Sequence, residues 1–256
     1  MKLLQLNIEK GRFLNDVIDY VHKENFDVIH FQEVTGGQFS YGEADCYQRL
    51  QTSLNNYSGS VSRSLGLISD PQAYYANATF VKKNLPVAAT EELWLGHFTK
   101  IDQIPGNNDP RWMEKPCTAL CVQVNIAQKK LWLINTHLPW SPRAVDTGDK
   151  TVLGNKIYDF VEKEKKPFVF TGDLNIRPGT KLINHLNTLG RNLIEENSII
   201  NTLNLATHKS AARIFPPGLA VDFIFVDRSL TVENFHVVDR PTLSDHLGLF
   251  LDFIPA

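Results

Sequence analysis

Cysteine is scarce in this sequence, and neither sign of charge predominates. The 256 residues include three cysteines, an odd number with no CxxC spacing. This pattern argues against a disulfide framework or a cysteine zinc site, and it favours a reducing compartment. The formal net charge is −2. Because proteins that grip long runs of nucleic-acid phosphates carry a basic surplus, a processive nucleic-acid binder is disfavoured.

Long apolar segments, repeats and linkers are also missing. Residues 1–7 lack the apolar run and the small-residue cleavage site of a signal peptide. No segment approaches the ~20 apolar residues of a membrane span. No repeat and no Pro/Gly/Ser-rich linker divides the chain. We therefore expect a single domain over residues 1–256, a cytoplasmic location and, by preference, a monomer.

What the sequence does contain is an apolar, aromatic interior for a mixed α/β domain. Apolar residues make up 43% of the chain, with 15 Phe, 7 Tyr and 4 Trp, which fits a sheet-rich core. Hydrophobic patterns predict strands over 3–8, 26–31, 57–62, 76–81, 87–94, 118–126, 130–135, 168–171, 220–226, 232–238 and 247–253. They predict helices over 13–24, 45–54, 149–164 and 180–189, and an exposed loop over 96–116. This order suggests two packed sheet layers with helices outside.

Polar side chains stand at the ends of several predicted strands. The residues concerned are Asn7, Glu33, His137, Asp173 with Asn175, Asp222, and Asp245 with His246. Carboxylate and amide oxygens are the ligands that Mg²⁺ prefers. An Asp can activate water, and a His beside an Asp can stabilise negative charge on phosphoryl oxygens. These residue types therefore indicate metal-assisted hydrolysis of a phosphate ester.

Each of these elements has an ordinary interpretation when taken alone. A Glu at the end of a strand is usually solvated, and Asp-Leu-Asn after a glycine commonly forms an Asx turn. A Ser-Asp-His triplet is often a cap or turn, and His137 alone could be a hydrogen-bonded core histidine. The catalytic interpretation is favoured because five of these elements, at Asn7, Glu33, His137, Asp173 and Asp245, occur in one order, each next to an apolar strand.

That order resembles the endonuclease/exonuclease/phosphatase superfamily, which has the fold of deoxyribonuclease I. Residues 171–175, Thr-Gly-Asp-Leu-Asn, and residues 244–247, Ser-Asp-His-Leu, carry the resemblance together with Asn7, Glu33 and His137. It extends over nearly the whole chain, from Leu6 to Phe253. It implies a four-layer α/β/β/α sandwich, in which two mixed sheets pack face to face with helices outside.

The resemblance also implies roles for individual residues. Asn7, Glu33 and Asp245 match metal-side positions for Mg²⁺ or Mn²⁺. Asp173 matches the residue that positions or deprotonates water, and Asn175 the one that steadies water and phosphate. His246, oriented by Asp222, matches a phosphate-contacting histidine. His137 matches a histidine that contacts the scissile phosphate or assists the leaving group.

Several assignments stay open from the sequence. Glu9 is either a metal contact or an exposed loop acid, with equal weight. Many relatives carry an Arg or Tyr before the strand that precedes the histidine, and either Arg111 or Lys115 could match it. Four more residues could bind substrate, namely Trp140, Arg143, Lys209 and Arg213. For Trp140 and Arg143 this is no stronger than the alternative that Trp140 covers a helix. For Lys209 and Arg213 an ordinary solvated patch is slightly favoured.

The combined expectation is a metal-dependent phosphodiesterase or nuclease that uses water to attack phosphorus. Its partner would be a phosphoester, either nucleic acid or a small phosphodiester. A phosphomonoesterase or lipid phosphodiesterase on the same site is the first alternative. A non-catalytic phosphoester-binding module is the second. The sequence does not choose the natural substrate, because one scaffold hosts many.

Overall fold

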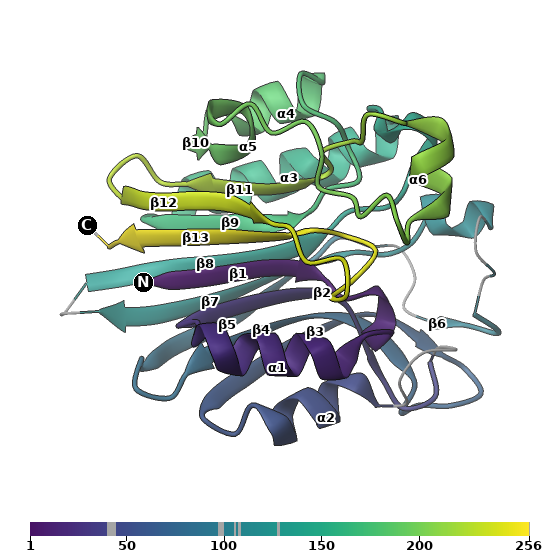
Figure 1. Ribbon diagram of the computed structural model, residues 1–256, viewed down its shortest axis with the longest axis horizontal. Coiled ribbons are helices and arrows are strands. Elements are labelled where there is room, and N and C mark those ends of the chain that lie inside the picture. Colours follow the sequence, from purple (N-terminus) through teal and green to yellow (C-terminus); the bar gives the residue numbers. More distant parts are fainter. Residues whose placement is uncertain (40–44, 97–99, 105, 107–108, 127–128, 256) are drawn as a thin grey trace.

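The computed structural model describes residues 1–39, 45–96, 100–104, 106, 109–126 and 129–255. Its strands form two mixed sheets that lie face to face, with helices on the outer side of each (Figure 1). The four-layer sandwich implied by the resemblance is therefore confirmed. In the described part of the chain, no helix combines the length and the apolar character needed to cross a membrane.

Among the described residues, one sheet has seven strands, and the N-terminal strand is the third of them. In spatial order they are β12 (Thr231–Val238), β13 (Gly248–Ile254), β1 (Lys2–Asn7), β2 (Val28–Gly36), β4 (Tyr74–Lys82), β3 (Tyr57–Leu67) and β6 (Lys100–Ile101). β1 and β2 are parallel, whereas β1 and β13 are antiparallel. Helices α1 (Leu14–Glu24) and α2 (Cys46–Ser53) cover the outer face (Figure 1).

The second sheet has six strands. In spatial order they are β10 (Arg191–Asn192), β11 (Asp222–Val226), β9 (Phe168–Asp173), β8 (Lys129–His137), β7 (Thr118–Ile126) and β5 (Val87–Trp94). The helices α3 (Gly148–Glu164), α4 (Lys181–Leu186) and α5 (Leu193–Glu196) lie over its outer face (Figure 1). The remaining helical segments are α6 (Lys209–Ile214), η1 (Glu9–Gly11), η2 (Pro110–Met113) and η3 (Pro142–Ala144).

Apolar patterning explains these layers. In α1 the buried side chains recur at helical spacing, at Leu14, Val17, Ile18 and Val21, so this helix places one apolar face on the sheet. It ends at Asn25, whose left-handed φ of 56° forms a common helix C-cap. β9 is buried at every position, as expected for a central strand covered on both faces.

Some predicted boundaries were wrong. The second strand does not end at Glu33 but runs on to Gly36, after a register shift between Phe31 and Val34. The predicted loop 96–116 contains β6 and η2, while residues 97–99, 105 and 107–108 lie outside the described residues. The fourth predicted helix stops at Leu186. The short elements β10, α5 and α6 were not predicted, because elements this short carry little periodicity.

Candidate active site

Three neighbouring strands of the six-stranded sheet bring three of the predicted catalytic residues into one row. β8 and β9 are parallel and pair His137 with Asp173. β9 and β11 are antiparallel and pair Asp173 with Asp222. The ends of β8 and β9 and the beginning of β11 therefore lie at the same edge, although the three residues are far apart in sequence. All three side chains are buried.

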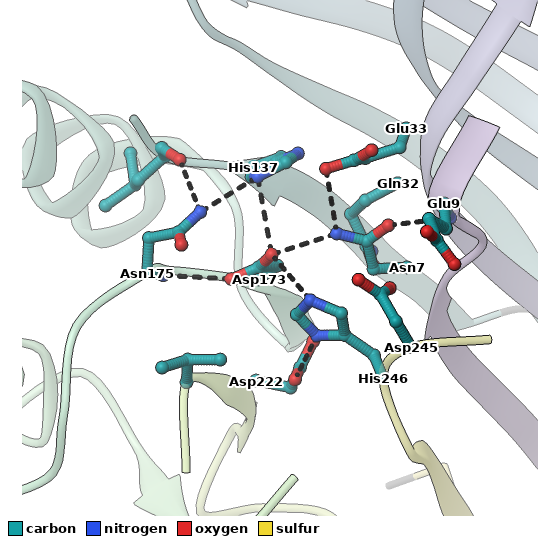
Figure 2. Close-up of polar contacts among 12 residues, drawn as sticks. Asn7, Glu9, Gln32, Glu33, His137, Asp173, Asn175, Asp222, Asp245 and His246 are labelled. Atoms are coloured by element: carbon teal, nitrogen blue, oxygen red, sulfur yellow. Dashed lines mark hydrogen bonds and ion pairs between the residues drawn. The ribbon is translucent and has the colours of Figure 1, made fainter. Parts of the chain in front are cut away.

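The opposite sheet contributes Asn7 and Glu33. Asn7 ends β1 and pairs with Gln32 of β2. Glu33 follows at a β-bulge and has a positive φ of 56°. A bulge places an extra residue in one strand and redirects its side chain, so Glu33 turns toward the other sheet. Asn7 Nδ2 donates to Glu33 Oε1 at 3.3 Å and to Asp173 Oδ2 at 3.0 Å, which joins the two sheets (Figure 2).

His246 reaches the site from the segment before β13 and is held by Asp222. Its Nδ1 lies 2.9 Å from Asp222 Oδ2, and its Nε2 lies 3.8 Å from Asp173 Oδ2 (Figure 2). Burial would lower the pKa of His246, but the charges of Asp222 and Asp173 outweigh it and raise the pKa well above 6.5. His246 is therefore an imidazolium ion, with its Nε2–H toward Asp173.

The Asp222 carboxylate is contacted by three hydrogen-bonding side chains. Besides His246, Thr202 Oγ1 donates to Oδ2 at 2.7 Å and Gln5 Nε2 donates to Oδ1 at 2.9 Å. The carboxylate has no exposed surface. These contacts fix the position of the carboxylate, so Asp222 orients the His246 ring.

His137 has the opposite protonation state. Burial and the positive charge of Lys115 lower its pKa to about 4, so the ring is neutral. Asn175 Nδ2 donates to His137 Nε2 at 2.9 Å and to the carbonyl of Leu138 at 3.1 Å. Nδ1 lies 3.3 Å from the hydroxyl of Tyr75. With Nε2 accepting from Asn175, the ring proton lies on Nδ1 and faces Tyr75, so His246 is the histidine that turns an N–H toward Asp173.

Asp173 lies at the centre of the group. Its Oδ1 accepts from the backbone N–H of Asn175 at 3.0 Å, which turns the chain after β9. Its Oδ2 faces Asn7, His137 and His246 (Figure 2). A carboxylate beside one imidazolium and one amide donor can hold a water molecule for attack on phosphorus.

Glu33 is paired with cationic side chains. Lys10 Nζ lies 2.9 Å from Glu33 Oε2. Burial acts to raise the pKa of Glu33, but the charges of Lys10 and Lys115 help to hold it well below its ordinary value. The Lys115 ammonium group is itself buried and lies 4.7 Å from the centroid of the Tyr75 ring.

Glu9 and Asp245 add two carboxylates on the same side as Asn7 (Figure 2). The backbone N–H of Glu9 donates to Asn7 Oδ1 at 3.1 Å. Burial, with the nearby charges of Asp245 and Glu33, raises the pKa of Glu9. Negative charges crowded in this way are stabilised by a cation, and Asn7, Glu9, Glu33 and Asp245 offer carboxylate and amide oxygens, the ligand types that Mg²⁺ and Mn²⁺ prefer.

Two further groups have ligand atoms within 4.8 Å of one another. One is the buried group Asp173, Asp222 and His246, which could bind a metal, and the other is His208, Asp245 and His246. In the first group, Asp222 already accepts three hydrogen bonds. In the second, His208 Nδ1 accepts from the backbone N–H of Ala211 at 3.2 Å. Glu33 and Asn7 Oδ1 are engaged in the same way, by Lys10 and by the backbone N–H of Glu9, so hydrogen bonding does not separate these donor sets.

The sequence left open whether Arg111 or Lys115 belongs to the site, and the structure shows that Lys115 faces it. Its charge acts on Glu33 and His137. The Arg111 guanidinium instead pairs with Asp109 at 2.7 Å, and its side chain is 46% exposed. The structure therefore places Arg111 away from the catalytic carboxylates.

The other predicted substrate residues lie on the surface. Trp140 is 41% exposed, and Arg143 and Arg213 are exposed. Among the described contacts, none joins these three side chains to the catalytic group. The side chain of Lys209 lies outside the described residues.

Sequence reasoning missed a layer of polar residues that lies between the sheets. Gln5 Nε2 donates to Gln32 Oε1 at 2.8 Å, and Gln32 Nε2 donates to Asn135 Oδ1 at 2.7 Å. Gln5 also donates to Asp222, so this buried amide chain supports the catalytic group. The sequence offered one signal for this layer, because Gln5 and Asn135 are polar residues at inward-facing positions of otherwise apolar strands. Tyr75 and Lys10 gave no such signal, because their partners are distant in sequence.

The fold and this group of side chains define a class, namely sandwich hydrolases that act on phosphate esters with a metal ion. The model of the Endonuclease/Exonuclease/phosphatase family matches residues 4–246. The chain belongs to this family of metal-dependent phosphoester hydrolases. A comparison with curated proteins gave no match.

Solved structures support the same fold. An endonuclease/exonuclease/phosphatase from Bacteroides vulgatus superposes with a TM-score of 0.73 at 17% identity, over 100% of this chain and 98% of that one. The mannosyl-6-phosphatase Bt3783 of Bacteroides thetaiotaomicron gives 0.67 at 14% identity, with 100% of both chains covered. D. rerio TDP2, complexed with a single-strand DNA product, gives 0.70 at 15% identity, over 100% and 99%.

Proposed function

We propose that this chain is a Mg²⁺- or Mn²⁺-dependent phosphodiesterase that hydrolyses a nucleic-acid end or a small phosphodiester. The observation that carries the proposal is the meeting of Asp173 with the His246 imidazolium and with Asn7, at 3.8 and 3.0 Å. This places a water-activating carboxylate, a positive N–H donor and a metal-side amide around one point.

The metal ion would be held by Glu33 and Asp245, with Asn7 and Glu9 beside them. When bound, it supplies positive charge to the phosphoryl and leaving oxygens. Asp173 would accept a proton from the attacking water. His246 would donate a hydrogen bond from Nε2 to a phosphoryl oxygen, and Lys115 would add a second positive charge close to Glu33.

An aromatic wall beside these groups favours an ester with a planar organic part. The Tyr75 ring lies 5.9 Å from the Trp112 ring and 6.1 Å from the His137 ring. Lys10 Nζ lies 5.8 Å from the centroid of Trp112. A base or another planar group could stack on Trp112 while its phosphate meets the ammonium groups. The DNA product bound to D. rerio TDP2 supports the diester choice.

The decisive experiment compares two substrates that share a leaving group. Bis-p-nitrophenyl phosphate and p-nitrophenyl phosphate both release p-nitrophenolate, so their kcat/KM ratio isolates the effect of the second ester. The proposal predicts higher kcat/KM for the diester, dependence on Mg²⁺ or Mn²⁺, and loss of turnover in Asp173→Asn and His246→Ala. Equal turnover in the two variants and the wild type would contradict it.

A phosphomonoesterase is the second candidate, and one observation favours it. Two ammonium groups, Lys10 and Lys115, lie close to Glu33, and two cations suit the dianion of a monoester. The similarity to a mannosyl-6-phosphatase agrees with this choice. A higher kcat/KM for p-nitrophenyl phosphate than for the diester would establish it in place of the phosphodiesterase.

A further inference from the structure

Lys150 is an unusual residue because its ammonium group is buried beneath the site. It lies in the first turn of α3, and only 1% of its surface is exposed. Burying an ammonium ion is costly unless acceptors surround it. Lys150 Nζ donates to Ser141 Oγ at 2.7 Å and also to the backbone carbonyl of Asn175.

These two bonds tie together the segments that follow β8 and β9. Ser141 belongs to the segment after β8, and its hydroxyl donates to the carbonyl of Val145 at 3.0 Å. Asn175 belongs to the segment after β9 and has a positive φ of 51°. An asparagine can adopt this conformation, but its carbonyl then requires a partner to hold it in place.

The side chain of the same asparagine reaches the catalytic group. Asn175 Nδ2 donates to His137 Nε2, and its backbone N–H donates to Asp173 Oδ1 (Figure 2). Lys150 itself touches neither His137 nor Asp173 among the described contacts. Its charge also acts on Asp173 directly, but the hydrogen bonds that link Lys150 to both residues run through Asn175.

We propose that Lys150 is a positioning residue, which fixes the Asn175 loop so that the Asn175 amide meets His137 and its backbone N–H meets Asp173. The proposal rests on the proposed hydrolytic function for its kinetic readout. The geometry of the His137 ring gives a second readout that does not depend on turnover.

The test is a double-mutant cycle between Lys150→Met and Asn175→Ala, with Lys150→Arg as the conservative variant. Methionine has a similar length but no donor, so both acceptors lose their partner. We expect Lys150→Met to lower kcat 10- to 100-fold with little change in KM, and to have almost no further effect in the Asn175→Ala background. Such non-additivity identifies residues that act as a unit. Lys150→Arg, which keeps the donors, should recover part of the lost kcat.

Lys165→Met is the matched control. Lys165 follows the same helix at its other end and is also buried, and it pairs with Glu91 at 2.8 Å, away from the catalytic group. We expect this variant to lower the free energy of unfolding while the folded enzyme keeps its kcat. A merely structural Lys150 would behave in the same way, and that result would overturn the proposal.

The second readout uses the ¹⁵N chemical shifts of the His137 ring in metal-free protein. In Lys150→Met, the Nε2 shift should move toward its value in Asn175→Ala, because both variants lose the same hydrogen bond. An unchanged shift in folded Lys150→Met would overturn the proposal even if the wild type hydrolysed none of the substrates tested. Absence of wild-type turnover with the predicted shift would count only against the proposed function.

Discussion

At the scale of single residues, the protonation states of the site follow from the partners of each group. His246 is charged because Asp222 and Asp173 face it, whereas His137 is neutral because burial and Lys115 oppose a charge there. One buried histidine therefore donates while its neighbour accepts. Burial lowers the pKa of Lys115, and the groups of Cys117, Glu33 and Asp173 partly offset that effect.

The first prediction separates Lys115 from Arg111. Lys115→Met should lower kcat/KM by roughly 10²–10³-fold, the usual loss for a group that stabilises transition-state charge. Arg111→Met should leave kcat/KM nearly unchanged, because its guanidinium is engaged by Asp109 at the surface. Steady-state kinetics with bis-p-nitrophenyl phosphate would measure both. Equal losses of kcat/KM in the two variants would contradict a direct role for the Lys115 charge in the site.

At the scale of elements, the site depends on how closely β8 and β9 approach one another. A Cβ atom on Gly172 would lie 2.2 Å from the carbonyl oxygen of Thr136 in β8. The next residue along each strand is the pair His137 and Asp173. Gly172 is therefore required by the distance between the strands that carry His137 and Asp173.

The second prediction follows from this close contact. Gly172→Ala should lower the free energy of unfolding by about 1–3 kcal/mol, as overpacking usually does, and should reduce kcat by displacing His137 from Asp173. Gly148→Ala is the control, since no atom lies within 4 Å of its added Cβ and alanine favours a helix. Urea unfolding and kcat would be measured for both. Wild-type values for Gly172→Ala would refute the argument.

Element patterns also explain how much the sequence could predict. The ends of β1, β8 and β9 were predictable because apolar runs stop near Asn7, His137 and Asp173, and the parallel strands β8 and β9 end at one edge of their sheet. The bulge at Glu33 was not predictable, since one extra residue changes the pairing without changing the apolar run. The clamp by Lys150 was also hidden, because a lysine in the first turn of a helix is normally solvated.

At the scale of the whole molecule, the two sheets meet through buried polar groups as well as apolar ones. His30 of β2 lies between the sheets, and its Nδ1 is 2.7 Å from Thr171 Oγ1 of β9. Burial lowers the pKa of His30 to about 3. With His137, the molecule therefore holds two buried histidines in the neutral form.

The third prediction is that the molecule loses stability as pH falls below the ordinary histidine pKa of 6.5. Below that value the unfolded chain binds protons at His30 and His137 that the folded chain does not bind, so unfolding is favoured. Each histidine should contribute about 1.4 kcal/mol per pH unit. His246 opposes this slope near pH 6.5, where its raised pKa keeps it charged in the folded chain only, and its contribution fades as the unfolded chain is protonated at lower pH.

Urea unfolding in EDTA between about pH 5 and pH 6, within this window, measures the slope. Above the ordinary glutamate pKa of 4.5, the lowered pKa of Glu33 contributes little change. His30→Gln should reduce the slope by roughly one proton, that is, about 1.4 kcal/mol per pH unit. A slope that stays the same in this variant would mean that His30 is not neutral in the fold.

The central claim is that the carboxylates around Asn7 hold a divalent cation on which hydrolysis depends. The most direct measurement is a Mn²⁺ titration of EDTA-treated protein, with the rate of bis-p-nitrophenyl phosphate hydrolysis followed for the wild type and Glu33→Gln. We predict no turnover before Mn²⁺ is added, saturable recovery in the wild type, and a large shift of the titration to higher Mn²⁺ concentrations in Glu33→Gln. Turnover that persists in EDTA, or identical titrations of the two proteins, would contradict the account.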